Sequence, residues 1–70
     1  MIGSIVKLKR KYIAVDEWTI RGYESLIGLV VDRWEDQDYK VVWQNGYKYC
    51  GNGEKTNTSW EYEYALEVVS

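Results

Sequence analysis

Histidine is missing from this 70-residue sequence, and cysteine occurs once, at Cys50. One cysteine cannot form an intrachain disulfide, and a structural zinc site usually takes four Cys or His ligands. The thiol also lacks a histidine that could act as its base, although Lys48 is close in sequence. We therefore expect no bound zinc, no intrachain disulfide and no cysteine-based catalysis.

Other signatures of catalysis are equally scarce. Asp36 and Asp38 form a pair of carboxylates, but they stand in an expected turn, where solvent would keep them from being tuned as acid and base. The segment GNG, at 51–53, is too short for a phosphate-binding loop, and the spacing of an EF-hand calcium loop is missing. The sequence therefore predicts a protein that is not an enzyme and carries no cofactor.

Long apolar runs are also missing. No segment reaches the roughly 18 apolar residues of a membrane helix. At the start of the chain a short apolar run precedes the basic residues, the reverse of the order in a secretory signal. Because the chain also has one free thiol, we expect an unprocessed cytoplasmic protein that makes no membrane contact.

Aromatic residues are what the sequence has in excess, with four Trp and seven Tyr but no Phe. A chain of this length forms one domain at most, covering residues 1–70, and buries only about 60% of the surface that its unfolded state exposes. Its small core must be built from Val, Ile, Leu and some of the rings. We expect the remaining rings to lie on the surface.

Alternating apolar and polar residues predict strands in three places. Residues 4–9, 27–34 and 38–44 show this two-residue period. The last two flank a short polar connection, EDQ at 35–37, and so predict a β-hairpin. The acidic residues around this turn serve in part as turn formers and in part as protection against pairing with other chains.

The remaining segments are less regular. Residues 10–26 are predicted to form a long loop, with a helical turn as an option. QNG at 44–46 predicts a second turn, because Asn-Gly is a strong hairpin signal, and a short strand is expected at 47–50. Residues 51–59 form a Gly- and Asn-rich loop. The final stretch, 60–69, is either one long strand or two strands separated by a helical turn.

Strand parity also predicts the core. Tyr39 and Trp43 lie on one face of their strand, and we expect them to pack inside. The aliphatic residues expected to be mostly buried are Val6, Leu8, Val30, Val41, Leu66 and Val68.

About five short strands and a long first loop predict an all-β fold, a small closed barrel of antiparallel strands. An open sheet of this size would leave long edges, which closure removes. GLVV at 28–31, YKVVWQNG at 39–46 and ALEVV at 65–69 resemble the SH3-like barrel of Tudor-type and KOW-type modules. The resemblance implies a module that docks peptides, methylated side chains or nucleic acid and that rarely catalyses.

A second resemblance bears on the fold only. GSIVKLKR at 3–10, IGLVV at 27–31 and TNTSWEYEYALEVV at 56–69 are similar to the small SH3-like subunit of photosystem I. The early proline of that subunit is missing here, as the chain has no proline at all. This similarity again implies a small SH3-like barrel.

An acidic cluster marks the predicted hairpin, since four carboxylates lie between Asp32 and Asp38. They form either a solvated loop or one end of a two-ended charge distribution that orients a partner. Tyr and Trp are enriched at binding hot spots, and we expect Trp18 and Trp34 to be exposed. The predicted protein-binding surface comprises Trp18, Trp34, Asp36, Asp38, Tyr47, Tyr49 and Trp60.

A narrower hypothesis is an aromatic cage for a methylated Lys or Arg, with acids close by. The rings at hand for it are Tyr39, Trp43, Tyr47, Tyr49 and Trp60. We favour the broader hypothesis of a generic docking surface. The chain would then be a small accessory or regulatory protein, of phage or bacterial type, that docks on a larger partner protein.

The alternative function is binding of single-stranded nucleic acid or a ribonucleoprotein by a basic groove with a stacking ring. The net charge of −2 argues against it. A basic cluster and Trp18 on one face, away from the hairpin, would favour nucleic acid, whereas exposed rings beside the acids would favour a protein partner. The residues of this alternative site are Lys7, Lys9, Arg10, Lys11 and Tyr12.

Overall fold

Short antiparallel strands and two single helical turns make up the fold. The computed structural model describes residues 1–14, 17–20 and 25–70. Within these ranges no helix is long and apolar enough to cross a membrane. In chain order the elements are β1 (Ile5–Leu8), the 3-10 helix η1 (Arg10–Tyr12), β2 (Trp18–Ile20), β3 (Ile27–Trp34), β4 (Asp38–Trp43), β5 (Gly46–Tyr49), β6 (Lys55–Thr56), β7 (Thr58–Tyr62), the 3-10 helix η2 (Glu63–Ala65) and β8 (Leu66–Val68).

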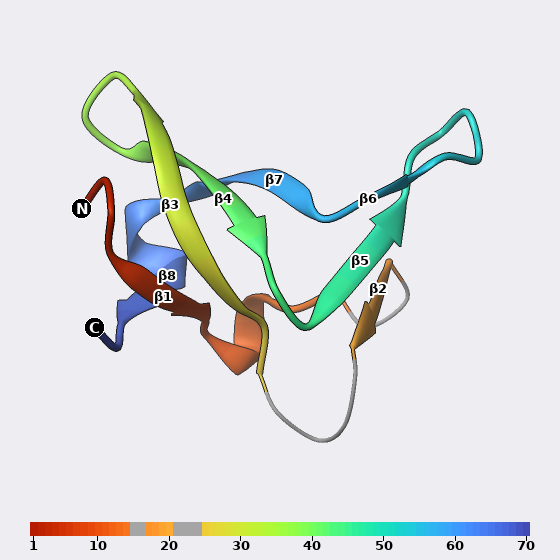
Figure 1. The fold of residues 1–70 in the computed structure, drawn as a ribbon, viewed down its shortest axis with the longest axis horizontal. Helices are drawn as coiled ribbons and strands as arrows, with labels where there is room; N and C mark the ends of the chain where they lie inside the picture. Colours follow the sequence, from red (N-terminus) through yellow and green to blue (C-terminus); the bar gives the residue numbers. More distant parts are fainter. Residues whose placement is uncertain (15–16, 21–24) are drawn as a thin grey trace.

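The strands form a sheet of five strands and a sheet of three. The larger sheet has the order β7-β4-β3-β1-β8 and the smaller the order β2-β5-β6, and all these pairings are antiparallel. The chain runs from β4 into β5 and from β6 into β7, so the smaller sheet extends from the larger one as an arm (Figure 1).

The expected closed barrel does not form among the described residues. The edge strands of the larger sheet are β7 and β8, and they do not pair with each other. The connection between them is η2, a single helical turn that leads the chain from one edge to the other without a ladder of hydrogen bonds. This part also settles the C-terminal alternatives, since a strand, a helical turn and a short strand follow one another.

The predicted central hairpin is confirmed. β3 pairs with β4, and residues 35–37 connect them. Glu35 has a φ of 57°, in the left-handed region that few residues other than glycine adopt. A β-bulge lies between Val30 and Asp32. Bulges bend a strand and increase its twist, and here the bulge separates the packed half of β3 from an exposed half that begins at Val31.

The core lies on one face of the larger sheet and agrees with the prediction except at Val68. This side chain is 53% exposed. It lies opposite Val6 in the ladder, but β8 is an edge strand and no further described strand covers it. Tyr39 and Trp43 are buried as expected. The aliphatic residues that are buried as predicted are Val6, Leu8, Val30, Val41 and Leu66.

Trp18 was expected on the surface, and this prediction is wrong. Its side chain is only 8% exposed and packs against Trp43, with 6.0 Å between ring centroids. The cause is β2, which pairs with β5 and so places Trp18 over the core. The expectation of a loop over residues 10–26 is accordingly only partly right, because η1 and β2 lie within it. The part of this prediction that concerns residues 15–16 and 21–24 falls outside the described residues.

The predicted second turn at 44–46 is present as a bend at residues 44 and 45, but it does not form a hairpin, because β4 and β5 do not pair with each other. The Asn45 side chain instead accepts a hydrogen bond from the Ile27 amide and donates one to the Ser25 carbonyl, both at 2.8 Å. Gly46 allows close packing, since a Cβ there would lie 2.5 Å from Leu26 Cδ2. The two residues serve to carry the chain from the larger sheet to the arm.

Candidate functional site

Strand register brings two rings and a carboxylate together at the tip of the β3–β4 hairpin. Trp34 lies opposite Asp38, and Asp38 lies opposite Tyr62 on β7. Residues opposite each other on neighbouring strands project from the same face, so these side chains form a row of ring, carboxylate and ring. A pocket of about 270 Å³ lies here, and its lining is Trp34, Glu35, Asp36, Gln37, Asp38 and Tyr62.

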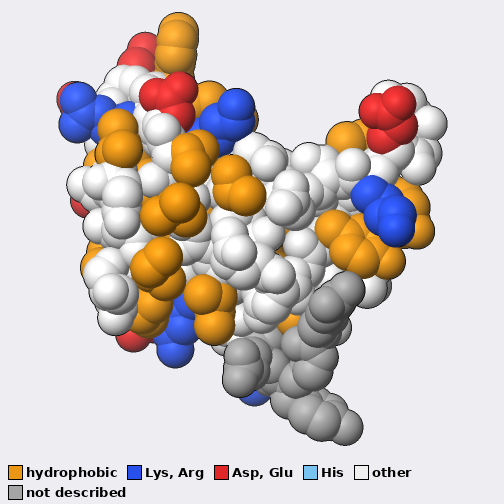
Figure 2. All heavy atoms as spheres, viewed as in Figure 1, with side chains coloured by type: hydrophobic (Ala, Val, Ile, Leu, Met, Phe, Trp, Pro, Cys, Tyr) orange, Lys and Arg blue, Asp and Glu red, His pale blue; other side chains and the backbone are white. Residues whose placement is uncertain are grey.

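Both rings of this row are open to solvent. Trp34 is 63% exposed and Tyr62 is 53% exposed. Asp36 is exposed, as expected, and Asp38 is half-buried. Figure 2 shows hydrophobic and acidic side chains side by side over this end of the molecule. Because the Trp34 ring contributes little to the core, most of its apolar surface is free to contact a partner.

Further tyrosines extend the pocket wall into a strip of rings. Tyr62 stacks on Tyr64, with centroids 5.3 Å apart and ring planes 7° apart. Tyr64 in turn meets Tyr12 edge to face, also at 5.3 Å, and Lys11 Nζ lies 5.1 Å from the Tyr12 ring centroid. All three tyrosines are exposed. The strip therefore runs from the acidic hairpin tip to the basic helix η1.

Buried hydrogen bonds hold β7 in the register that forms the row. Trp43 Nε1 donates to Ser59 Oγ at 2.8 Å, and Ser59 Oγ donates to Glu61 Oε2 at 2.7 Å. At the end of the strand the Glu63 amide donates to the Gln37 carbonyl at 2.7 Å. A slip of one residue would turn Tyr62 to the other face, so these contacts position the pocket wall.

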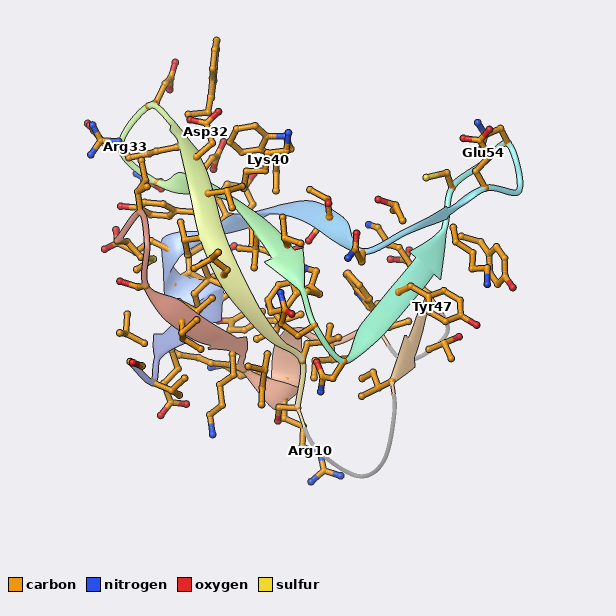
Figure 3. The ribbon with its side chains drawn as sticks, viewed as in Figure 1. Arg10, Asp32, Arg33, Lys40, Tyr47 and Glu54 are labelled. Carbon is orange, nitrogen blue, oxygen red and sulfur yellow. The ribbon has the colours of Figure 1, made fainter. Side chains whose placement is uncertain are left out.

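Arg33 and Lys40 lie near the carboxylates of the hairpin (Figure 3), but the pocket lining itself contains three acids and no Lys or Arg. Within the described ranges the lone ion pair joins Lys7 to Glu67 at 3.6 Å, so no described Lys or Arg lies within ion-pair distance of a hairpin carboxylate, although Lys40 lies opposite Asp32. The described carboxylates and Cys50 are likewise not gathered in threes as metal ligands would be. The pocket is therefore an acidic site with ring walls.

The other predicted binding residues are spread over the molecule. Trp60 is exposed and lies one row below the pocket, in a row with Lys40 and Asp32. Tyr47 and Tyr49 lie on β5 in the arm, and Figure 3 shows Tyr47 far from Asp32. Of the residues predicted for the protein-binding surface, Trp34, Asp36 and Asp38 are the ones that share a pocket.

The hypothetical cage is not brought together. Tyr39 and Trp43 are in the core, at 7% and 1% exposure. Tyr47 contacts Tyr49 at 5.8 Å, and Lys55 Nζ lies 4.9 Å from the Tyr47 ring centroid. The face of the Tyr47 ring is thus already occupied by Lys55 of this chain and is not free for a methylated ligand.

The basic cluster lies away from the acidic tip. Lys7 is half-buried on β1 and is ion-paired with Glu67, and Lys9 follows the strand. Arg10 and Lys11 are exposed on η1. Figure 3 shows Arg10 at the opposite end of the molecule from Asp32 and Arg33.

Sequence reasoning missed Tyr62 and Tyr64 as surface residues. The alternation along residues 60–69 puts them on the same side as Leu66, and the helical turn η2 breaks that alternation. Opposite-strand pairing of Tyr62 with Asp38 has no local signal in the sequence. No protein-family model, curated protein or solved structure matches the chain.

Proposed function

We propose that this protein is a small non-enzymatic interaction module that docks on a partner protein through the hairpin tip. The observation that carries the proposal is the pocket in which the exposed rings of Trp34 and Tyr62 flank the Asp38 carboxylate. Tryptophan and tyrosine are the residues most often found at energetic hot spots of interfaces. Fully burying a large apolar side chain contributes on the order of 2 kcal/mol to association.

The charge distribution supports a protein partner that binds in one orientation. The tip is acidic, the other end of the ring strip is basic at Lys11, and Tyr62 and Tyr64 lie between the two ends. A partner with charges of the opposite arrangement would be steered into a single orientation, because charged groups act chiefly on encounter and register. Exposed rings beside the acids are also the arrangement that, from the sequence, we expected for a protein partner rather than for nucleic acid.

The strand order supports an SH3-like arrangement as the finer description of the fold. In the larger sheet β1 lies between β3 and β8, so the last strand returns to the first. The remaining neighbours follow in chain order, and a helical turn precedes the last strand. An SH3-like barrel needs this order, and its closure would require only that β7 and β8 approach each other. We therefore infer that the module is an open relative of such barrels.

Single-stranded nucleic acid is the second candidate ligand, and the tyrosine strip is the observation that favours it. Successive bases can stack on rings such as Tyr12 and Tyr64 beside a basic group such as Lys11. Against it, Lys7 is occupied by Glu67, and the buried Trp18 offers no stacking face. We therefore rank this function second.

Affinity capture tests the proposal. Immobilised wild-type chain is incubated with nuclease-treated lysate of the organism that encodes it, and bound proteins are identified by mass spectrometry. We expect a protein that wild type retains and Trp34→Ala loses. Tyr49→Ala is the matched control, because its ring is 59% exposed but lies on the arm. Retention by Trp34→Ala, or capture only of nuclease-sensitive material, would contradict the proposal.

A further inference from the structure

The spacing of the row at the hairpin tip defines what can enter it. Neighbouring strands are about 4.8 Å apart, so Trp34 and Tyr62, separated by one strand, stand roughly 10 Å apart at the backbone. A planar group between two ring faces needs roughly 7 Å, twice the contact distance between carbon atoms. The space between Trp34 and Tyr62, which we call the slot, is therefore wide enough at the backbone for one flat group, and it belongs to the pocket of about 270 Å³.

The floor of the slot selects for positive charge. Asp38 lies between the two rings in the row, and an ionised carboxylate only accepts hydrogen bonds. Glu35 and Asp36 add two further carboxylates to the pocket lining. Among the described residues no Lys or Arg pairs with any of the three. A cationic ligand in the slot would therefore meet carboxylates that have no ion-pair partner among the described residues.

Among cations, a guanidinium matches this geometry best. It is planar, stacks on aromatic faces and can donate two parallel hydrogen bonds to one carboxylate. A lysine ammonium is a compact, strongly hydrated charge that uses the slot shape less well. A metal ion would need several carboxylates converging on one point, and the described residues contain no such group.

One wall of the slot, Tyr62, is also held in place before any ligand arrives. Tyr64 stacks on Tyr62 and is itself supported by the edge-to-face contact with Tyr12. The Glu63 amide bonded to the Gln37 carbonyl ties the end of β7 to the hairpin turn. A wall that is already positioned loses little entropy on binding, which favours recognition of a single side chain.

From these contacts we propose that the pocket of Trp34, Asp38 and Tyr62 binds an arginine side chain of the partner protein. The guanidinium lies between the two rings and donates its hydrogen bonds to the Asp38 carboxylate. This inference rests on the proposed function, since it names the partner group that the hairpin tip recognises.

Titration with capped tripeptides tests the inference without a known partner. The probes are acetylated and amidated Gly-Arg-Gly, its lysine counterpart and its citrulline counterpart, which keeps the shape but not the charge. Nuclear magnetic resonance follows the Trp34 indole N–H and the backbone amides of β3, β4 and β7. We expect saturable shifts at the tip, with the arginine peptide bound at least roughly tenfold more tightly than the citrulline peptide and about threefold more tightly than the lysine peptide.

Two variants identify the contacts. Asp38→Asn keeps the side-chain shape and should weaken arginine binding by roughly tenfold or more. Glu54→Gln removes the same charge from the tip of the arm (Figure 3) and should leave arginine binding within about twofold, because an exposed, distant charge is screened. Thermal unfolding of both variants shows whether the fold is retained, and Trp34→Ala provides a second variant that should abolish binding.

The outcomes separate this inference from the proposed function. Equal binding of the three peptides, shifts away from the tip, or no binding of the arginine peptide in the millimolar range overturns the arginine slot. Competition by calcium chloride at constant ionic strength would instead assign the pocket to a metal ion. If the slot fails while partner capture still depends on Trp34, the docking function stands. If capture does not depend on Trp34, the docking function is contradicted, whatever the peptide titration shows.

Discussion

The arm and the hairpin tip both display aromatic rings, but they differ in the source of the neighbouring cation. On the arm, Lys55 Nζ lies 4.9 Å from the Tyr47 ring centroid and Lys48 Nζ lies 5.4 Å from that of Trp18. At the tip, Trp34 and Tyr62 line a pocket with carboxylates instead. In the described part of the chain no Lys or Arg is placed over these two rings or paired with the acids.

This difference separates a surface that stabilises the fold from one that is free to bind. A lysine over an exposed ring contributes about 0.5–1 kcal/mol, so the arm uses its own charges to hold β2, β5 and β6 together. Acids crowded at the tip repel one another and therefore oppose folding slightly. Because the turn needs only one or two short polar residues, the proposed binding of a partner would account for the carboxylates that the turn does not require.

Replacing one tryptophan in each region should give the largest effect. Trp18→Ala removes a buried ring from its contact with Trp43, and we expect it to lower the free energy of unfolding by about 3–5 kcal/mol. Trp34→Ala should change it by no more than about 0.5 kcal/mol, because that ring is mostly exposed. Chemical denaturation of both variants measures the two values. A loss of several kcal/mol in Trp34→Ala would mean that the tip is structural and would remove the contrast.

A smaller effect should follow from breaking the contact that holds β7. Ser59→Ala leaves the buried Trp43 Nε1–H without its acceptor, which costs about 1–3 kcal/mol. Thr58→Ala is the matched control, since its hydroxyl makes only a long, exposed hydrogen bond to Asn57 at 3.4 Å. Denaturation curves and amide hydrogen exchange of β7 measure the change. Equal stability of Ser59→Ala and the control would show that the register of the tip does not depend on Ser59.

The arm lysine should have a weaker effect still. We expect Lys55→Met to lower the free energy of unfolding by about 0.5–1 kcal/mol, because it removes the charge over the Tyr47 ring while keeping a side chain of similar length. Lys40→Met removes a charge from the larger sheet, where the described structure places it over no ring, and serves as the control. Thermal unfolding at two salt concentrations measures both. The same loss in both variants would indicate a general charge effect rather than a ring contact.

The sequence predicted those parts of the fold that depend on neighbouring residues. The β3–β4 hairpin joins two strands through residues 35–37, so alternation and turn composition are enough to define it. The pairing of β2 with β5 brings Thr19 opposite Tyr47 across a long stretch of chain, and no local pattern indicates it. Trp18 was misplaced for that reason. The role of Asn45 was wrongly predicted for the same reason, since its hydrogen-bond partners Ser25 and Ile27 lie about twenty residues earlier in the chain.

The sequence predicted the hairpin side of the candidate site but not the wall that β7 contributes. Trp34, Asp36 and Asp38 come from one hairpin, and the exposure of Trp34 and Asp36 followed from their place at a strand end and turn, whereas Asp38 is half-buried. The second wall, Tyr62, depends on the register between β4 and β7. That register is fixed by buried contacts such as the one between Trp43 and Ser59, which form only once the sheet is assembled. No local pattern in the sequence therefore indicated that Tyr62 lies beside Asp38.

The smallest effect expected is on the rate at which the partner binds. Asp36 is exposed at the pocket rim, and a rim charge acts mainly on association, whereas a central ring acts on dissociation. We expect Asp36→Asn to slow association about twofold to threefold at low salt. The effect should shrink as salt is raised above the physiological concentration, because the Debye length then falls below about 8 Å. Surface plasmon resonance with the captured partner, at two salt concentrations, measures this rate. Glu54→Gln removes the same charge from the tip of the arm, so an equal slowing in that variant would assign the effect to net charge. No slowing in Asp36→Asn at low salt would mean that Asp36 only forms the turn and protects the strand edge. Electrostatic steering of the partner would then come from the other acids of the hairpin, or would not occur.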